Sequence, residues 1–289
     1  MKTLKEFLQE AGENGSAVGH FNISNLVQLK GVIMACKKAN LPVMIGTSEG
    51  EADFIGMRTA RHLIDAAKVE TGLPIFLNAD HFHSFLKAKE AIDVGYDSVL
   101  IDCSKKPYRE NLEETKKVVQ YAKVKNPDIS VEGELGYLVT ESSKIYKEAV
   151  TIPPESLTKP EEALKYVEET GVDRFAPAVG NLHGIAANKP QLDFELIKKL
   201  RAVLPQDVTL VMHGGSGIPD EQMKEAIELG FNNIHVSTEI RIAYMDALRK
   251  MLGAAPEETT PYKIYKPVVE AISQKVSEKL ELFGSINEI

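Results

Sequence analysis

The chain has 289 residues, of which 43% are hydrophobic and 26% are charged, a composition typical of a globular protein. Its 34 basic and 42 acidic residues give a net charge of −8, which argues against nucleic acid or an anionic membrane as a partner. Cys36 and Cys103 sit in apolar contexts and are expected to be reduced thiols. No stretch resembles a signal peptide or a membrane span, so we expect a cytoplasmic protein.

Short apolar segments rich in Val, Ile and Leu recur along the chain, each followed by a polar turn. There are eight: 17–22, 42–48, 74–80, 98–104, 130–136, 174–180, 209–216 and 233–239. Between them, residues 84–95, 109–125, 160–171 and 219–230 follow a helical period. Eight strand–helix units predict an α/β fold, a single-domain (β/α)8 TIM barrel over residues 1–289. An open doubly wound sheet is the alternative, but no Gly-x-Gly-x-x-Gly follows the first strand.

Two segments stand apart from this repeat. Residues 137–159, YLVTESSKIYKEAVTIPPESLTK, form the one long irregular stretch, and a loop of this length in a compact domain is usually a functional, mobile lid or a disordered segment. Residues 262–283 predict a C-terminal helix whose apolar stripe covers either the barrel or a neighbouring subunit.

The histidines gather where the predicted strands end. Six of the seven lie within a predicted strand or close to its C-terminal end, and only His62 falls in a helix. In a barrel these strand ends form the active-site face. His81, His183 and His213 follow or end the segments 74–80, 174–180 and 209–216, so three neutral imidazoles can hold one Zn²⁺ there. A single such histidine is usually structural, so the prediction depends on their convergence.

Acidic residues are expected on the same face. Asp80 precedes His81, and Asp102 ends the segment 98–104. Glu132 and Glu134 share one face of the segment 130–136, because side chains alternate along a strand. A buried carboxylate requires a partner or a metal ion. An ion pair is the alternative role for each acid, above all for Glu132.

A glycine-rich turn follows His213. Gly214, Gly215 and Gly217 expose backbone amides, and Ser237 and Thr238 precede the helix after the last strand. The loops after the last two strands of such barrels commonly bind phosphate. A metal beside a phosphate site suits a sugar phosphate whose carbonyl is polarised by the metal. The predicted strands contain no lysine, which disfavours a Schiff-base route.

These motifs resemble one enzyme family over nearly the whole chain. GHFNISN, NADH (78–81), VEGELG (131–136), GNLHG (180–184), MHGGSG (212–217) and VSTEIRIAY (236–244) match the class II, metal-dependent fructose-bisphosphate and tagatose-bisphosphate aldolases in order and spacing. The resemblance implies reversible, zinc-dependent cleavage of a ketose 1,6-bisphosphate. Fructose 1,6-bisphosphate is the expected substrate, giving dihydroxyacetone phosphate and glyceraldehyde 3-phosphate. The resemblance also implies a homodimer or homotetramer and allows a monovalent cation.

The resemblance implies a role for each matching residue. His81, His183 and His213 would hold the Zn²⁺, while Glu134 and Asp102 would mark an inner position that the metal can visit. Asp80 would shuttle the proton at the C4 oxygen. An acid of the mobile loop, Glu141 in preference to Glu148, would handle the proton at the dihydroxyacetone carbon. The substrate and phosphate contacts would be Asn22, Ser48, Gly184, Gly214, Gly215, Ser216, His235, Ser237 and Thr238.

Three departures from the family pattern keep other functions open. Phe82 follows the Asp-His pair in place of glycine, the loop lacks the usual paired glycine and adjacent acids, and His235 replaces an asparagine that touches the transferred triose. The alternatives are an aldolase for another ketose phosphate, such as tagatose 1,6-bisphosphate or a monophosphate, and a non-catalytic barrel that binds a metal or a sugar phosphate. A metal-dependent isomerase or epimerase is a third.

Overall fold

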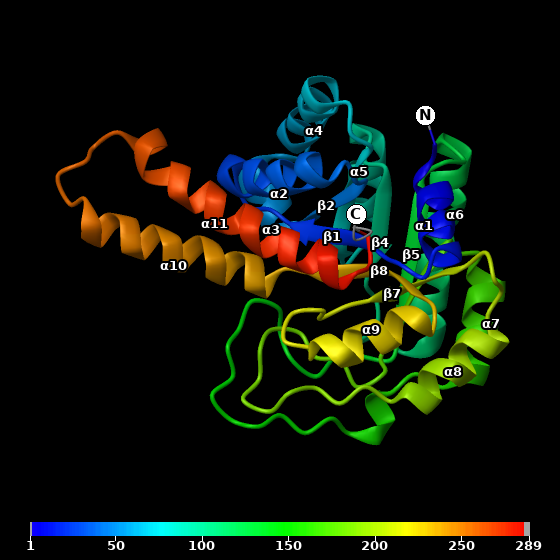
Figure 1. Ribbon diagram of the computed structural model, residues 1–289. Helices are drawn as coiled ribbons and strands as arrows, with labels where there is room; N and C mark the ends of the chain where they lie inside the picture. The colour runs from blue at the N-terminus through cyan, green and yellow to red at the C-terminus, as the bar shows by residue number, and fades with distance from the viewer. Residues whose placement is uncertain (1, 286–289) are drawn as a thin grey trace.

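Eight parallel strands close into one barrel, in which β1 pairs with β8, so the predicted (β/α)8 fold is confirmed and the open sheet is excluded (Figure 1). The computed structural model describes residues 2–285; residues 1 and 286–289 of the predicted domain lie outside this range. The strands are β1 Val18–Asn22, β2 Val43–Ser48, β3 Ile75–Phe82, β4 Ser98–Ile101, β5 Ser130–Leu135, β6 Arg174–Pro177, β7 Thr209–Met212 and β8 Phe231–Val236.

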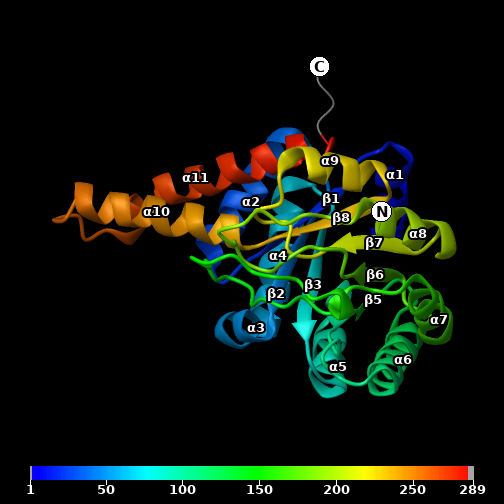
Figure 2. The ribbon, with the colours of Figure 1, turned by 90° about the horizontal axis from the view of Figure 1, so that it is seen from below.

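Helices surround the barrel on the outside (Figures 1 and 2). They are α1 Leu4–Glu13, α2 Leu26–Ala39, α3 Glu49–Ile55, α4 Met57–Thr71, α5 Phe85–Val94, α6 Tyr108–Lys125, α7 Pro160–Thr170, α8 Phe194–Val203, α9 Asp220–Glu228, α10 Thr238–Ala254 and α11 Pro261–Leu282. The helices predicted at 84–95, 109–125, 160–171, 219–230 and 262–283 correspond to α5, α6, α7, α9 and α11. Among residues 2–285, none of the helices combines the length with the hydrophobicity that a membrane-spanning segment needs.

Several strands end earlier than their apolar segments do. β4, β6 and β7 end at residues 101, 177 and 212, although their segments were predicted to reach 104, 180 and 216. Gly180 and Gly214 have φ angles of +99° and +63°, and this left-handed backbone turns the chain out of the sheet. At the last strand, Ser237 is the N-cap of α10 and Thr238 its first residue. The residues after the shortened strands therefore lie in loops at the rim of the barrel.

The last two helices form an arm that extends away from the barrel (Figures 1 and 2). The base of α11 packs on α2, where a Cβ added to Gly31 would lie 2.5 Å from Ile272 Cγ2. Beyond α11 the chain returns to the start of β1. There Ala17 N donates to Phe283 O at 3.0 Å, and Ser285 Oγ donates to Ala17 O at 2.7 Å.

The barrel interior contains a buried guanidinium group. Arg174 on β6 is 1% exposed, and its Nη1 lies 2.6 Å from Glu132 Oε2. It also donates to Ser130 Oγ at 3.1 Å and to Asn233 Oδ1 at 2.9 Å, and it contacts polar groups on β3 and β4. Because a buried charge is tolerated only when it is paired and hydrogen-bonded, these polar groups stabilise the charge together.

We expect Arg174→Ala to lower the free energy of unfolding by about 3 to 5 kcal/mol, because it leaves the Glu132 carboxylate buried without the guanidinium that pairs with its Oε2. Urea denaturation followed by circular dichroism measures this change. The matched control is Lys165→Ala, which removes an exposed cation 3.7 Å from Glu169 and should cost less than about 0.5 kcal/mol. Equal stability of the two variants would show that the Arg174 ion pair does not support the barrel.

Candidate active site

An irregular turn of β3 directs two adjacent side chains into one cavity. In a regular strand Asp80 and His81 would point to opposite faces. Here the pairing of β3 with β4 shifts between Ala79 and Phe82, and His81 has a φ of +51°. Such a left-handed backbone is uncommon for a residue with a side chain and is typical of functional sites. As a result, both Asp80 and His81 line the same cavity.

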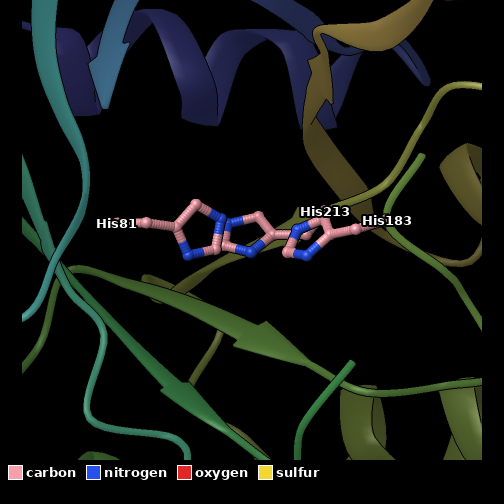
Figure 3. Close-up of side chains that lie close together, drawn as sticks. All are labelled: His81, His183 and His213. Atoms are coloured by element: carbon pink, nitrogen blue, oxygen red, sulfur yellow. The ribbon is translucent and has the colours of Figure 1, made fainter. Parts of the chain in front are cut away.

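Three histidines from three strand ends meet beside this turn. One ring nitrogen from each of His81, His183 and His213 lies within 4.8 Å of the others. The ring of His81 approaches those of His213 and His183, with centroids 4.7 and 4.9 Å away (Figure 3). Imidazole nitrogens are preferred zinc ligands, and three of them leave a coordination position for substrate. This donor set fits a zinc ion.

Carboxylates orient two of the three rings. His81 Nδ1 is 2.8 Å from Asp102 Oδ2, and His213 Nε2 is 2.7 Å from Glu132 Oε1. His81 thus keeps Nε2, and His213 keeps Nδ1, for another ligand. His213 Nδ1 and Glu134 Oε2 lie 3.2 Å apart, yet both are buried atoms without a hydrogen-bond partner in the described part of the chain. A cation beside them would satisfy both atoms, and carboxylate–histidine contacts of this kind are usual around metal ions.

The surrounding charges set the protonation of the histidines. Burial lowers the pKa of His81, but the carboxylates of Asp80 and Asp102 outweigh burial and raise it to about 9. Burial also disfavours a charged His213, and its two glutamate neighbours raise its pKa well above the usual value. Burial and the two other imidazoles hold the pKa of His183 well below the usual value. Without a metal ion, two of the three rings therefore carry a proton that a cation must displace.

Asp80 lies between an amide and an imidazole. Asn22 Nδ2 donates to Asp80 Oδ2 at 2.8 Å, and His235 Nδ1 lies 3.4 Å from Asp80 Oδ1. The His235 ring stacks on that of His20, with centroids 3.6 Å apart. Burial alone would raise the pKa of Asp80, but His81, His235 and His20 keep it well below the usual value. Asp80 is therefore a carboxylate that can accept a proton from a bound ligand.

Two adjoining cavities occupy the rim of the barrel. The larger has a volume of about 320 Å³ and the smaller about 30 Å³, and they share Asn22, Asp80, His81, Ser142 and His183 as lining residues. Ser48, Asp102, Glu134 and Glu141 line only the larger cavity. Gly184, His213, Gly214, Ser216, His235, Ser237 and Thr238 line only the smaller one.

Most site residues predicted from the sequence line one or both cavities; the exceptions are Glu132, the alternative loop acid Glu148, Gly215 and Gly217. The amide of Gly215 donates to His235 O at 3.0 Å, and a Cβ added to Gly215 would lie 2.8 Å from that oxygen. The structure thus places Gly215 against β8, behind the cavity wall.

The smaller cavity has the properties of an anion site. A Cβ added to Gly184 would lie 2.3 Å from Lys144 O, and one added to Gly214 would lie 2.0 Å from Leu182 O, so only glycine lets these loops approach one another. Ser237 Oγ is buried without a hydrogen-bond partner among residues 2–285. Thr238 begins the long helix α10, whose N-terminal backbone amides attract anions. A phosphate group fits this combination.

The long loop 137–159 lies over both cavities. It contains one short 3₁₀ helix, Pro154–Ser156, and one isolated bridge between Ile145 and Ile185, and is otherwise irregular. Glu141 lines the larger cavity with a side chain that is 66% exposed and paired with Lys144. Ser143 N donates to Thr238 Oγ1 at 3.3 Å, which joins the loop to the start of α10. The loop therefore places an acid above the histidines.

Some residues of the site were not predicted from the sequence. Lys105, Ser142 and Arg241 line the cavities, and Glu51 lies directly behind the wall. Two of them had a local signal: Arg241 follows Thr238 by about one helical turn, and Glu51 completes the Ser-x-x-Glu pattern of a helix N-terminus.

The chain is similar to known aldolases over almost its whole length. Residues 2–288 match the family model described as fructose-bisphosphate aldolase class-II. The chain is 38% identical over 288 residues to a fructose-bisphosphate aldolase of Staphylococcus aureus, covering 99% of this chain and 98% of that protein. It is 37% identical over 286 residues to the fructose-bisphosphate aldolase of Geobacillus stearothermophilus, with coverages of 98% and 96%.

Solved structures agree with this similarity. The YdjI aldolase of Escherichia coli K12 superposes with a TM-score of 0.84 at 31% identity, covering 98% of this chain and 97% of that one. A putative fructose-1,6-bisphosphate aldolase of Coccidioides immitis gives a TM-score of 0.85 at 24% identity, with coverages of 99% and 97%, and supports the fold alone.

Zinc added to the metal-free protein at pH 7 should release about two protons, because His81 and His213 must lose theirs to become ligands. Since those protons compete with the metal, apparent zinc affinity should rise with pH until about pH 9. A pH-stat titration with elemental analysis measures both quantities. His213→Ala should bind well below one zinc per chain, whereas His62→Ala, in α4 on the outside, should bind zinc normally. Full occupancy of His213→Ala would remove His213 from the ligand set.

Proposed function

Because the chain belongs to the class-II fructose-bisphosphate aldolase family and is therefore an aldolase, we propose that it cleaves a phosphorylated ketose with the help of a bound zinc ion. Fructose 1,6-bisphosphate, the sugar in its relatives' names, is the first candidate, with dihydroxyacetone phosphate and glyceraldehyde 3-phosphate as products. One observation carries this proposal: a donor set suited to zinc adjoins an anion site in one pair of connected cavities.

In this proposal His81, His183 and His213 hold the zinc, and Glu134 with Asp102 offers a second, inner position. The bound ion supplies Lewis acidity at the ketose carbonyl. The glycines at the smaller cavity, with Ser216, Ser237 and Thr238, bind the phosphate next to that carbonyl and so fix the position of the sugar.

Protein side chains carry the two proton transfers. Asp80, oriented by Asn22, takes the proton of the C4 hydroxyl as the C3–C4 bond breaks and the aldehyde leaves. The electron pair of that bond stays on C3, and an acid of the loop 137–159 delivers a proton to this carbon to give dihydroxyacetone phosphate. We assign this acid to Glu141, because it lines the larger cavity. His235 faces both Asp80 and the smaller cavity, where it contacts the triose half of the sugar.

A second candidate substrate is a ketose phosphate without the 6-phosphate, and the ion pair between Arg241 and Glu51 favours it. The three clustered imidazoles, with the carboxylates of Asp80 and Glu141 lining the same cavity, argue against a non-catalytic role. We also propose a homodimer or homotetramer, because the arm exposes apolar surface: Met245, Leu252 and Tyr262 are 39%, 51% and 72% exposed.

Purified protein should cleave fructose 1,6-bisphosphate, should lose this activity in a chelator and should regain it with zinc. The release of dihydroxyacetone phosphate, coupled to NADH oxidation, gives the rate. Asp80→Asn serves as the active-site control: it should bind zinc normally while its turnover falls by about 10² to 10⁴-fold. Undiminished cleavage in the chelator would contradict the metal's role, and undiminished turnover of Asp80→Asn would contradict the role of this carboxylate.

Glu141→Gln should slow the exchange of the C3 hydrogen of dihydroxyacetone phosphate with deuterated solvent by about 10² to 10⁴-fold. The reason is that the amide of glutamine cannot give or take the proton that the Glu141 carboxyl transfers. Proton NMR of dihydroxyacetone phosphate with the zinc-loaded enzyme follows this exchange. Glu148→Gln is the matched control on the same loop, and it should exchange at the wild-type rate. The opposite pattern would assign the carbon proton to Glu148.

A further inference from the structure

One buried carboxylate connects three parts of the cavity wall. Glu51, at the start of α3, is 7% exposed. Its Oε2 accepts hydrogen bonds from Asn22 Nδ2 at 3.1 Å and from both Ser48 N and Ser48 Oγ at 2.9 Å. Its Oε1 accepts from Ser24 Oγ at 3.1 Å and from Arg241 Nη2 at 2.5 Å. In every one of these contacts the partner donates the hydrogen bond and the carboxylate accepts it.

Helix capping accounts for only part of this arrangement. Ser48 and Glu51 form a capping box, in which each side chain bonds the backbone of the other residue. The chain has a second capping box at Thr3 and Glu6, and that one lies on the surface at the start of α1. Glu51 additionally holds the guanidinium of Arg241, which follows 190 positions later in the sequence. A capping role does not require that contact.

Two of the residues that Glu51 holds belong to one end of the binding space, while a third, Asn22, lines both cavities. Ser48 and Arg241 line the larger cavity, whereas the residues of the anion site line the smaller one. A ketose with its 1-phosphate in the anion site and its carbonyl at the histidines would extend its far end into the larger cavity. A hydroxyl and a guanidinium are the groups that a second phosphate there would use.

Both groups are already engaged by a negative charge. Ser48 Oγ and one Arg241 Nη donate to Glu51, so a phosphate dianion would compete with this carboxylate and would be repelled by it. The same cavity also contains Asp102, and Glu141 lies at its edge. Lys105 and Arg241 are the lysine and arginine among the lining residues, and Asp80 and Glu134 add two further carboxylates to the wall. An uncharged hydroxyl-bearing end can accept from the remaining guanidinium N–H groups without adding charge.

We propose that Glu51 is a specificity-determining residue, which makes the larger cavity select ketose 1-phosphates whose far end carries hydroxyls over ketose bisphosphates. This inference rests on the proposed aldolase function and specifies its substrate class. The atoms of the reaction are unchanged: the same C3–C4 bond breaks, and the departing aldehyde carries hydroxyls in place of a phosphate.

The test compares fructose 1-phosphate with fructose 1,6-bisphosphate as substrates of the zinc-loaded full chain. The wild type should show a kcat/KM for the monophosphate at least equal to that for the bisphosphate. Glu51→Ala and Glu51→Gln should shift this ratio by at least about tenfold toward the bisphosphate, through a lower KM for the bisphosphate. Glu51→Gln retains the shape and part of the hydrogen bonding, so it keeps the test valid if Glu51→Ala fails to fold.

Two controls separate this role from a structural one. Glu49→Gln removes the neighbouring acid, whose Oε1 accepts from His83 N at 2.8 Å, and it should leave the ratio unchanged. Glu6→Ala removes the other capping-box acid and should also leave it unchanged. A purely structural Glu51 would lower kcat for both sugars together and preserve the ratio, and that result would overturn the inference.

Isothermal titration calorimetry measures the binding affinity of each sugar, and so tests the inference without relying on turnover. Zinc-loaded Glu51→Gln should bind the bisphosphate at least about tenfold more tightly than the wild type does, with little change for the monophosphate. An unchanged affinity for the bisphosphate would overturn the inference even if cleavage is observed. Failure of the wild type to cleave either sugar with zinc present would refute the proposed function, while the two binding constants would still decide the role of Glu51.

Discussion

The charge of Arg174 at the centre of the barrel is the constraint on which the site depends. Barrel interiors are usually filled by branched apolar side chains. Here the interior also contains a guanidinium, and a charge at that depth requires oxygen partners around it. Strands β3, β4, β5 and β8 supply these partners. One of them, Glu132, reaches upward to His213, so the ion pair in the interior also orients an imidazole of the rim.

At the rim, acidic side chains lie beside histidines and an arginine, so opposite charges offset one another. Carboxylates contact two of the three clustered imidazoles directly, and Asp80 lies next to the cluster in sequence and in space. The same balance recurs at Arg241, where Glu51 compensates the cation. The glycine-rich loops differ, because they offer backbone amides and hydroxyls and contribute no side-chain charge. The binding space is therefore neutralised at one end and open to an anion at the other.

The sequence was sufficient to predict the barrel and most of its rim. In a closed parallel barrel the carboxyl ends of all strands meet at one face, so the positions of His81, His183 and His213 after apolar segments predicted that they converge. The alternation rule could not show that Asp80 and His81 share a cavity, because that depends on one left-handed residue. The contact between Glu51 and Arg241 was equally hidden, since it joins two helices distant in the sequence.

Because the first strand of the barrel pairs with the last, the barrel can close only late in the synthesis of the chain. One edge of β1 pairs with β8, and α2 packs on α11, and both β8 and α11 belong to the last quarter of the chain. While a ribosome makes the intervening residues, an unpaired strand edge and an apolar helix face remain uncovered. The barrel of the nascent chain therefore cannot close until most of the chain has been synthesised. A premature stop before β8 would leave this edge of β1 unpaired, and a stop before α11 would leave α2 without the helix that packs on it.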